Sequence, residues 1–238
     1  MTLTGYLVVA GALTVAACLQ ASIGFGMAML AAPVVAVIDP SLVPGTLIVQ
    51  ATVLSLLVTV ADRQHIDLRG TGWALVGRVP GTVAGALLVA TLPQQGLALM
   101  LSAVVLLGVV LTCFGWAPRP HRPALVLAGS ASGLFGTATS IGGPPMALVW
   151  QGRDAPVVRS TMSGFFLVGS VLSIATLAST GSIGTHTLAM SAALAPASVL
   201  GYVLSRYVNR FMDARRLRWA AIGVSTLGAV LLIGQQLL

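Results

Sequence analysis

Ser140-Ile141-Gly142-Gly143-Pro144-Pro145 lies in the middle of an apolar run over residues 124–152. A proline inside a helix removes a backbone donor and clashes with the preceding turn, so this stretch divides the run into two helices. Ser22-Ile23-Gly24-Phe25-Gly26 interrupts a similar run over residues 4–38. As one helix that run would be about 52 Å long, against a hydrocarbon core of about 30 Å. Both interruptions therefore predict a hairpin of two helices that enters and leaves by the same face.

The composition identifies the class of protein. Hydrophobic residues make up 57% of the 238 residues and charged residues 7%, with 12 Arg, 5 Asp and neither Lys nor Glu. Soluble domains carry roughly 25% charged residues, so this chain could not cover a water-exposed surface. The composition argues against a soluble enzyme and a nucleic-acid-binding domain. It predicts an all-α polytopic membrane protein in contact with the lipid bilayer.

Polar breaks divide the chain into two sets of five apolar segments. The segments are 4–21, 26–38, 41–61, 71–92, 96–115, 124–139, 144–152, 160–179, 188–205 and 219–237. The two interruptions match at an offset of 118 residues. A second match, at an offset of 116 residues, pairs Gly77, Pro80, Gly81 and Gly85 with Ala193, Pro196, Ala197 and Gly201. We therefore predict a duplication, with repeats over residues 1–118 and 119–238 in one membrane domain. The small residues at four-residue spacing predict close approach of helices.

The arginines indicate how the chain crosses the membrane. If both interrupted runs are hairpins, the loops 62–70, 116–123, 151–159 and 206–218 share one face and carry 11 of the 12 Arg. Short loops rich in Arg lie in the cytoplasm, so this face is predicted to be cytoplasmic. Each repeat is then a re-entrant hairpin plus three transmembrane helices. Three crossings invert the second repeat relative to the first and leave both termini outside.

The two interruptions also predict a binding site. Inverted repeats with interrupted helices are typical of secondary transporters, which bind their substrate near the midplane. A helix N-terminus offers unpaired N–H groups and a partial positive charge, and glycine lets an anion approach the backbone. The alternative is a tight glycine turn that serves helix packing. The candidate substrate-binding residues are Gln20, Ser22, Gly24, Phe25, Gly26, Thr139, Ser140, Gly142, Gly143 and Pro144.

Arg78 is the ionisable residue that lies well inside a predicted span. Charges within a membrane are costly and mark functional sites, so Arg78 is a further candidate for binding the anion. It lies about two helical turns from the Arg-rich face, so the other interpretation is a side chain that extends to that face.

These residues resemble the sulfite exporter TauE/SafE family of bacterial membrane proteins. The resemblance is carried by Gly24-Phe25-Gly26 with Pro33 in the first half. In the second half it is carried by Gly129, Gly133 and Gly136 leading into the stretch 139–145. The resemblance implies a multi-pass inner-membrane transporter of small anions, with sulfite and organosulfonates such as sulfoacetate among the substrates. It also implies that both glycine-containing turns contribute to the binding site.

The sequence thus predicts a carrier of sulfite or an organosulfonate that works by alternating access, one repeat rocking against the other. An anion channel and a membrane-embedded enzyme or assembly factor are the alternatives. No Asp or His lies inside a predicted span, and the three His have no metal-ligand spacing. We therefore expect no catalytic residue, no metal and no cofactor. A homodimer, the direction of transport and the coupling ion are left open by the sequence.

Overall fold

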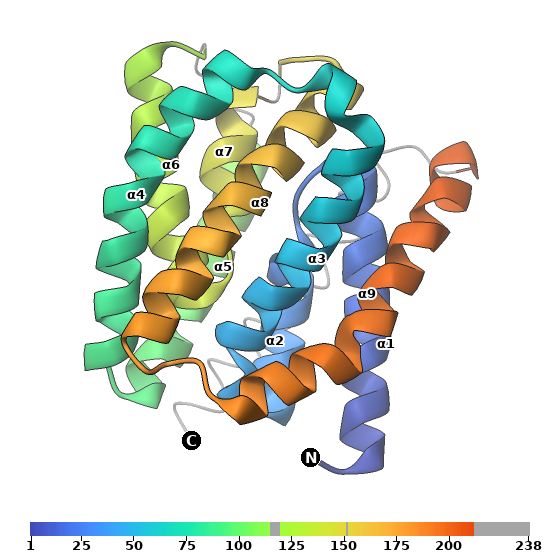
Figure 1. The fold of residues 1–238 in the computed structure, drawn as a ribbon, viewed down its shortest axis with the longest axis vertical. Coiled ribbons are helices and arrows are strands. Elements are labelled where there is room, and N and C mark those ends of the chain that lie inside the picture. Colours follow the sequence, from blue (N-terminus) through green and yellow to red (C-terminus); the bar gives the residue numbers. More distant parts are fainter. Residues whose placement is uncertain (115–119, 151, 212–238) are drawn as a thin grey trace.

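The computed structural model describes residues 1–114, 120–150 and 152–211, and within them the chain is helical without a β-strand (Figure 1). The α-helices are α1 Leu3–Ile23, α2 Met27–Ile38, α3 Gly45–Asp62, α4 Leu68–Thr91, α5 Gln94–Phe114, α6 Arg122–Thr139, α7 Gly143–Trp150, α8 Ala155–Ser179 and α9 Thr185–Phe211. Two short 3-10 turns lie at Pro40–Leu42 and Arg63–His65. The all-α prediction is confirmed, and each of the first nine predicted segments coincides with one helix. The tenth, 219–237, lies outside the described residues.

Five of the helices are long and apolar enough to cross a membrane. They are Leu3–Ile23, the stretch Gly45–His65, Leu68–Thr91, Ala155–Ser179 and Thr185–Val208. A helix rises about 1.5 Å per residue, so spans of this length match a core of about 30 Å. Large apolar side chains such as Val76, Leu87 and Val171 are exposed on their outer sides, where lipid tails would cover them. The chain is a multi-pass membrane protein.

The first predicted hairpin is formed by α1 and α2. Gly24 ends α1 at φ 92° and Gly26 precedes α2 at φ 108°, a left-handed conformation that glycine adopts without a steric penalty. A Cβ on Gly5, near the start of α1, would lie 3.2 Å from the Cγ2 of Ile38, the last residue of α2. The hairpin therefore returns to the end at which it began. With 12 residues, α2 is about 18 Å long and too short to cross the core.

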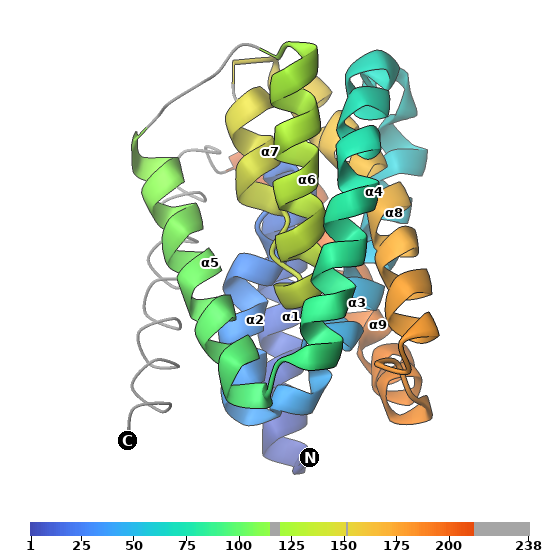
Figure 2. The ribbon, with the colours of Figure 1, turned by 90° about the vertical axis from the view of Figure 1, so that its left-hand side faces the viewer.

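The second hairpin, α6 and α7, turns at Ser140, which adopts φ 67°. The first residue of α6 and the last residue of α7 both lie beside the first turns of α4. The Arg122 guanidinium stacks 5.0 Å above the Trp73 ring, and a Cβ on Gly70 would lie 3.3 Å from the Cζ2 of Trp150. The two hairpins approach from opposite ends of the molecule, with α1 and α2 toward the N-terminus (Figure 2).

The two hairpins pack against helices of the opposite half in the same way. α4 lies along α6, where a Cβ on Gly85 would be 2.6 Å from the Leu134 carbonyl oxygen. α9 lies along α1, where a Cβ on Gly201 would overlap the Thr14 carbonyl oxygen. The small residues thus allow backbone-to-backbone contact, as predicted. Gly201 follows Gly85 by 116 residues, and Leu134 lies two residues beyond Ser132, which the 118-residue offset pairs with Thr14, so the packing is reciprocal to within one helical turn. The inverted duplication stays a prediction, and this reciprocity is what it requires.

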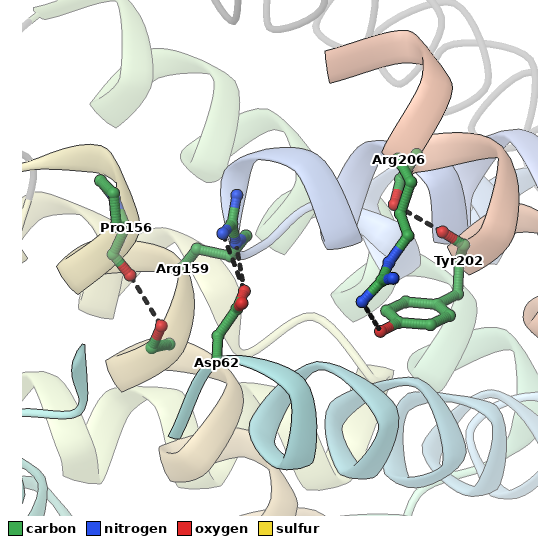
Figure 3. A network of polar contacts seen from close by, with 7 residues as sticks. Asp62, Pro156, Arg159, Tyr202 and Arg206 are labelled. Atoms are coloured by element: carbon green, nitrogen blue, oxygen red, sulfur yellow. Dashed lines mark hydrogen bonds and ion pairs between the residues drawn. The ribbon is translucent and has the colours of Figure 1, made fainter. Parts of the chain in front are cut away.

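The loops predicted to share one face lie at one end of the bundle, as far as the chain is described (Figure 1). The α3–α4 and α7–α8 junctions meet there through an ion pair between Asp62 Oδ2 and Arg159 Nη2 at 2.8 Å (Figure 3). Nearby on α9, Arg206 donates to the Tyr202 hydroxyl at 3.2 Å. We call this the Arg-rich end. The α2–α3, α4–α5 and α8–α9 junctions lie at the other end. Arg119 and the Arg at 215, 216 and 218 lie outside the described residues.

Candidate functional site

The turns of the two hairpins meet inside the bundle. A Cβ on Gly143, at the start of α7, would lie 3.2 Å from the Cβ of Phe25 in the α1–α2 turn. A cavity of about 40 Å³ lies between the turns, which is room for a few water molecules or one small solute. Six of the predicted site residues line the cavity: Gln20, Gly26, Arg78, Ser140, Gly142 and Gly143. Residues of both turns thus line one cavity, and binding of a substrate there stays a prediction.

The N-terminus of α2 opens on this cavity. Gly26 precedes the helix without a side-chain cap, and Ala28 and Met29 of the first turn border the cavity. The Met27 amide donates to Gln20 Oε1 at 3.3 Å, which satisfies one of the amides that a helix start leaves unpaired. The amides of Ala28 and Met29 have no acceptor in the described part of the chain. They are available as donors to a bound anion.

The N-terminus of α7 opens on the cavity from the other side. Ser132 Oγ, on α6, donates to the Gly142 carbonyl oxygen at 2.7 Å and fixes the turn. Ser140 Oγ donates to the Pro44 carbonyl oxygen at 3.1 Å, which ties this turn to the segment before α3. Because Pro144 and the proline after it have no N–H, the first turn of α7 offers fewer donors than that of α2.

Arg78 lies beside the second turn and is 3% exposed. Its Nη1 donates to Ser132 Oγ at 3.1 Å, and its guanidinium carbon lies 4.8 Å from the centre of the Phe165 ring. Gly169, on α8, makes room for the guanidinium, since a Cβ there would overlap Nε. Nε is buried and donates to no acceptor in the described part of the chain. The interpretation that Arg78 extends to the Arg-rich face is wrong, because the side chain points into the bundle instead.

The other five predicted residues do not line the cavity. Ser22 Oγ and Thr139 Oγ1 donate to carbonyls within their own helices, at 2.7 and 2.8 Å. A Cβ on Gly24 would lie 2.9 Å from Arg159 Cα, and Phe25 packs on Gly143. Pro144 Cγ would lie 2.7 Å from a Cβ on Gly108. These residues shape and support the two turns, and direct contact of any of them with substrate stays a prediction.

The sequence did not identify the residues of α6 and α8 that contact the Arg78 side chain. Ser132, Phe165, Phe166 and Gly169 come from α6 and α8, and Ser170 reaches the cavity from α8. Ser132 and Gly169 look like ordinary small residues of membrane helices. The one indication in the sequence was the pair of glycines near Arg78. Gly77 and Gly81 predict that this side of α4 lies close to another helix.

Comparison with known proteins gives one match. The family model described as sulfite exporter TauE/SafE matches residues 8–232 of 238. Neither the curated proteins nor the solved structures compared with the chain give a significant match.

Proposed function

Because the chain belongs to the sulfite exporter TauE/SafE family, we propose that it carries sulfite or an organosulfonate across the membrane. Membership of the family implies an anion transporter, and one structural observation supports sulfite or an organosulfonate as the anion. The starts of α2 and α7 open on the same cavity, together with a buried arginine that has no carboxylate partner among the described residues.

This arrangement suits an oxyanion on electrostatic grounds. Each helix start places a partial positive charge at the cavity, and Arg78 adds a full one. A sulfite or sulfonate group presents three oxygens, which can accept from amides and from the guanidinium at the same time. Phe165 and Phe166 cover the guanidinium on the side of α8, so Arg78 interacts with the anion in a water-poor site. Charge-assisted hydrogen bonds are stronger there than in water.

Two contacts between the hairpins and the opposite half are candidates for gates in an alternating-access cycle. Gly24 packs on the Arg159 backbone, next to the Arg-rich end. Ser140 donates to the carbonyl oxygen of Pro44, a residue that borders a second hollow of about 280 Å³ toward the other end. Because Ser140 lines the inner cavity and Pro44 the outer hollow, this contact separates the two. We propose that each contact opens in turn, so that the anion exchanges with one side at a time.

The charge distribution supports an orientation with the Arg-rich end in the cytoplasm of a bacterial cell and both termini outside. Export of an anion is then downhill in the membrane potential by about 2.3 kcal/mol per charge per 100 mV. Uptake would need a coupled cation.

The test is flux in proteoliposomes. Purified protein should move radiolabelled sulfite and methanesulfonate with saturation, and external substrate should accelerate the release of internal substrate, as in a carrier. Gly143→Val should abolish most of this flux, because the side chain would meet Phe25 at the turn. Gly11→Val is the matched control, since no atom lies within 4 Å of a Cβ at that position. Folded protein that moves neither anion faster than protein-free vesicles would overturn the proposal.

A further inference from the structure

The charges around the cavity are unbalanced. Arg78 is the charged residue among those of the described chain that line the cavity, and the lining contains no Asp and no His. The helices packed against this part of α4 are α6 and α8. From α6 the guanidinium meets Ser132 and Gly136, and from α8 it meets Phe165, Phe166 and Gly169. None of these carries a charge or titrates, so the protein supplies one unit of positive charge.

The two helix starts do not supply a second full charge. The carbonyl oxygen of the Gln20 side chain already occupies the Met27 amide of α2. At α7 the two prolines remove two of the amides that would face the ligand, and the helix has only eight residues. The remaining amides orient an anion, and the charge that neutralises it is that of Arg78.

We propose that the cavity selects anions with a single negative charge: sulfonates and hydrogen sulfite, in preference to sulfate and the sulfite dianion. The inference rests on the proposed function, because it concerns the same site. A monoanion and Arg78 form a neutral pair inside the bundle. A dianion would leave one negative charge without a partner in a low-dielectric environment, which is strongly unfavourable. One wall of the cavity favours the same choice, since the side chains of Met29, Ile48 and Ala51 offer apolar contact to a methyl group but no donor to a fourth oxygen.

Methanesulfonate and sulfate provide a matched pair of probes. Both have a tetrahedral sulfur, which carries three oxygens and a methyl group in methanesulfonate and four oxygens in sulfate. We expect purified protein in nanodiscs to bind methanesulfonate at least roughly tenfold more tightly than sulfate. The apparent affinity for sulfite should fall as the pH rises through the second ionisation of sulfite. The affinity for methanesulfonate, which remains a monoanion, should stay level over the same range.

Variants of Arg78 test whether its positive charge causes the preference for monoanions. Arg78→Gln should weaken methanesulfonate binding by roughly tenfold or more and remove the preference over sulfate, whereas Arg78→Lys should retain the preference. Arg69→Gln is the matched control, because it removes an exposed arginine from the same helix. Sulfate that binds as tightly as methanesulfonate, or an Arg78→Gln protein that keeps its preference, would overturn the inference. In either case flux of sulfite in proteoliposomes would leave the transport function standing, and absence of any flux would remove that function itself.

Discussion

Replacing Gly133 by alanine tests whether the contact between α4 and α6 holds Arg78 at the site. Gly133 lies on α6 against the backbone of α4. A Cβ there would be 2.5 Å from the Arg78 carbonyl oxygen and 2.8 Å from the Thr82 amide nitrogen. Both are backbone atoms, so no side chain can swing aside to relieve the clash. The helices themselves must separate.

The size of the separation follows from these distances. Ordinary contact begins at 3.4 Å, so the carbonyl contact requires a shift of about 0.9 Å. A shift of that size along the line from Arg78 Nη1 to Ser132 Oγ would stretch their hydrogen bond from 3.1 Å to about 4.0 Å, beyond hydrogen-bonding distance. Overpacking of this kind costs about 1–3 kcal/mol of stability. The lost hydrogen bond, worth about 1.5–3 kcal/mol, would no longer hold the Arg78 guanidinium at the cavity, so the affinity for an anion should fall by roughly tenfold to hundredfold.

Two measurements on detergent-purified protein check the expectation: the unfolding temperature, and the affinity for methanesulfonate. Gly133→Ala should lower both. Gly72→Ala should lower neither, because Gly72 lies on α4 with open space around a Cβ, and alanine favours the helix more than glycine does. A Gly133→Ala protein with unchanged unfolding temperature and affinity would refute the argument, since it would mean that the two helices are not in direct backbone contact at this position.

Three further variants address the site and the topology. Gly169→Ala places a methyl group on the Arg78 guanidinium, so it should reduce anion affinity strongly in a binding titration while the unfolding temperature changes little, because the flexible side chain moves rather than the helices. Ser132→Ala removes the hydroxyl that bridges Arg78 and the second turn, and should cost about tenfold in affinity; unchanged binding would exclude that bridge from the site. In a background without native cysteines, Asp39→Cys should react with an impermeant thiol reagent outside right-side-out vesicles and Arg153→Cys only after permeabilisation. Reaction of both from outside would contradict the predicted orientation.

The hairpins could be predicted from the sequence because their cause is local. Gly24, Gly26 and the prolines after Gly143 determine the backbone conformation whatever surrounds them. The ends of the membrane-spanning helices could be predicted less accurately. α8 begins at Ala155, before the predicted 160, and α9 continues to Phe211, beyond the predicted 205. Apolar residues mark the part of a helix that lipid covers, and polar residues such as Arg159 and Arg206 continue the same helix outside it.

The site could be predicted only in part, because its remaining residues depend on how three helices pack. The distance of Arg78 from the end of α4 left two orientations open, inward or toward the Arg-rich end. The orientation is decided by the neighbours at positions 77 and 81, whose glycines lie against the α6 backbone and turn this side of α4 inward. The partners on α8, Phe165 and Gly169, have no local signature, since any apolar membrane helix contains such residues.

The packing also indicates which parts would move together in the proposed alternating-access cycle. Arg78 belongs to the first half of the chain, yet its partners are on α6 and α8. Its counterpart in the second half, Leu194, is fully buried in the hydrophobic core, so the halves are not equivalent in charge. Because α4 and α6 touch through their backbones at Gly81 and Gly133, a rocking of one sequence half against the other would break this backbone contact. In the proposed cycle we therefore expect α4 to move with the α6–α7 hairpin, and α9 to move with the α1–α2 hairpin. In such a cycle we expect Arg78 to stay on Ser132 while its distance from the α2 amides changes, so the second hairpin would retain the charge of the site and the first would open and close it.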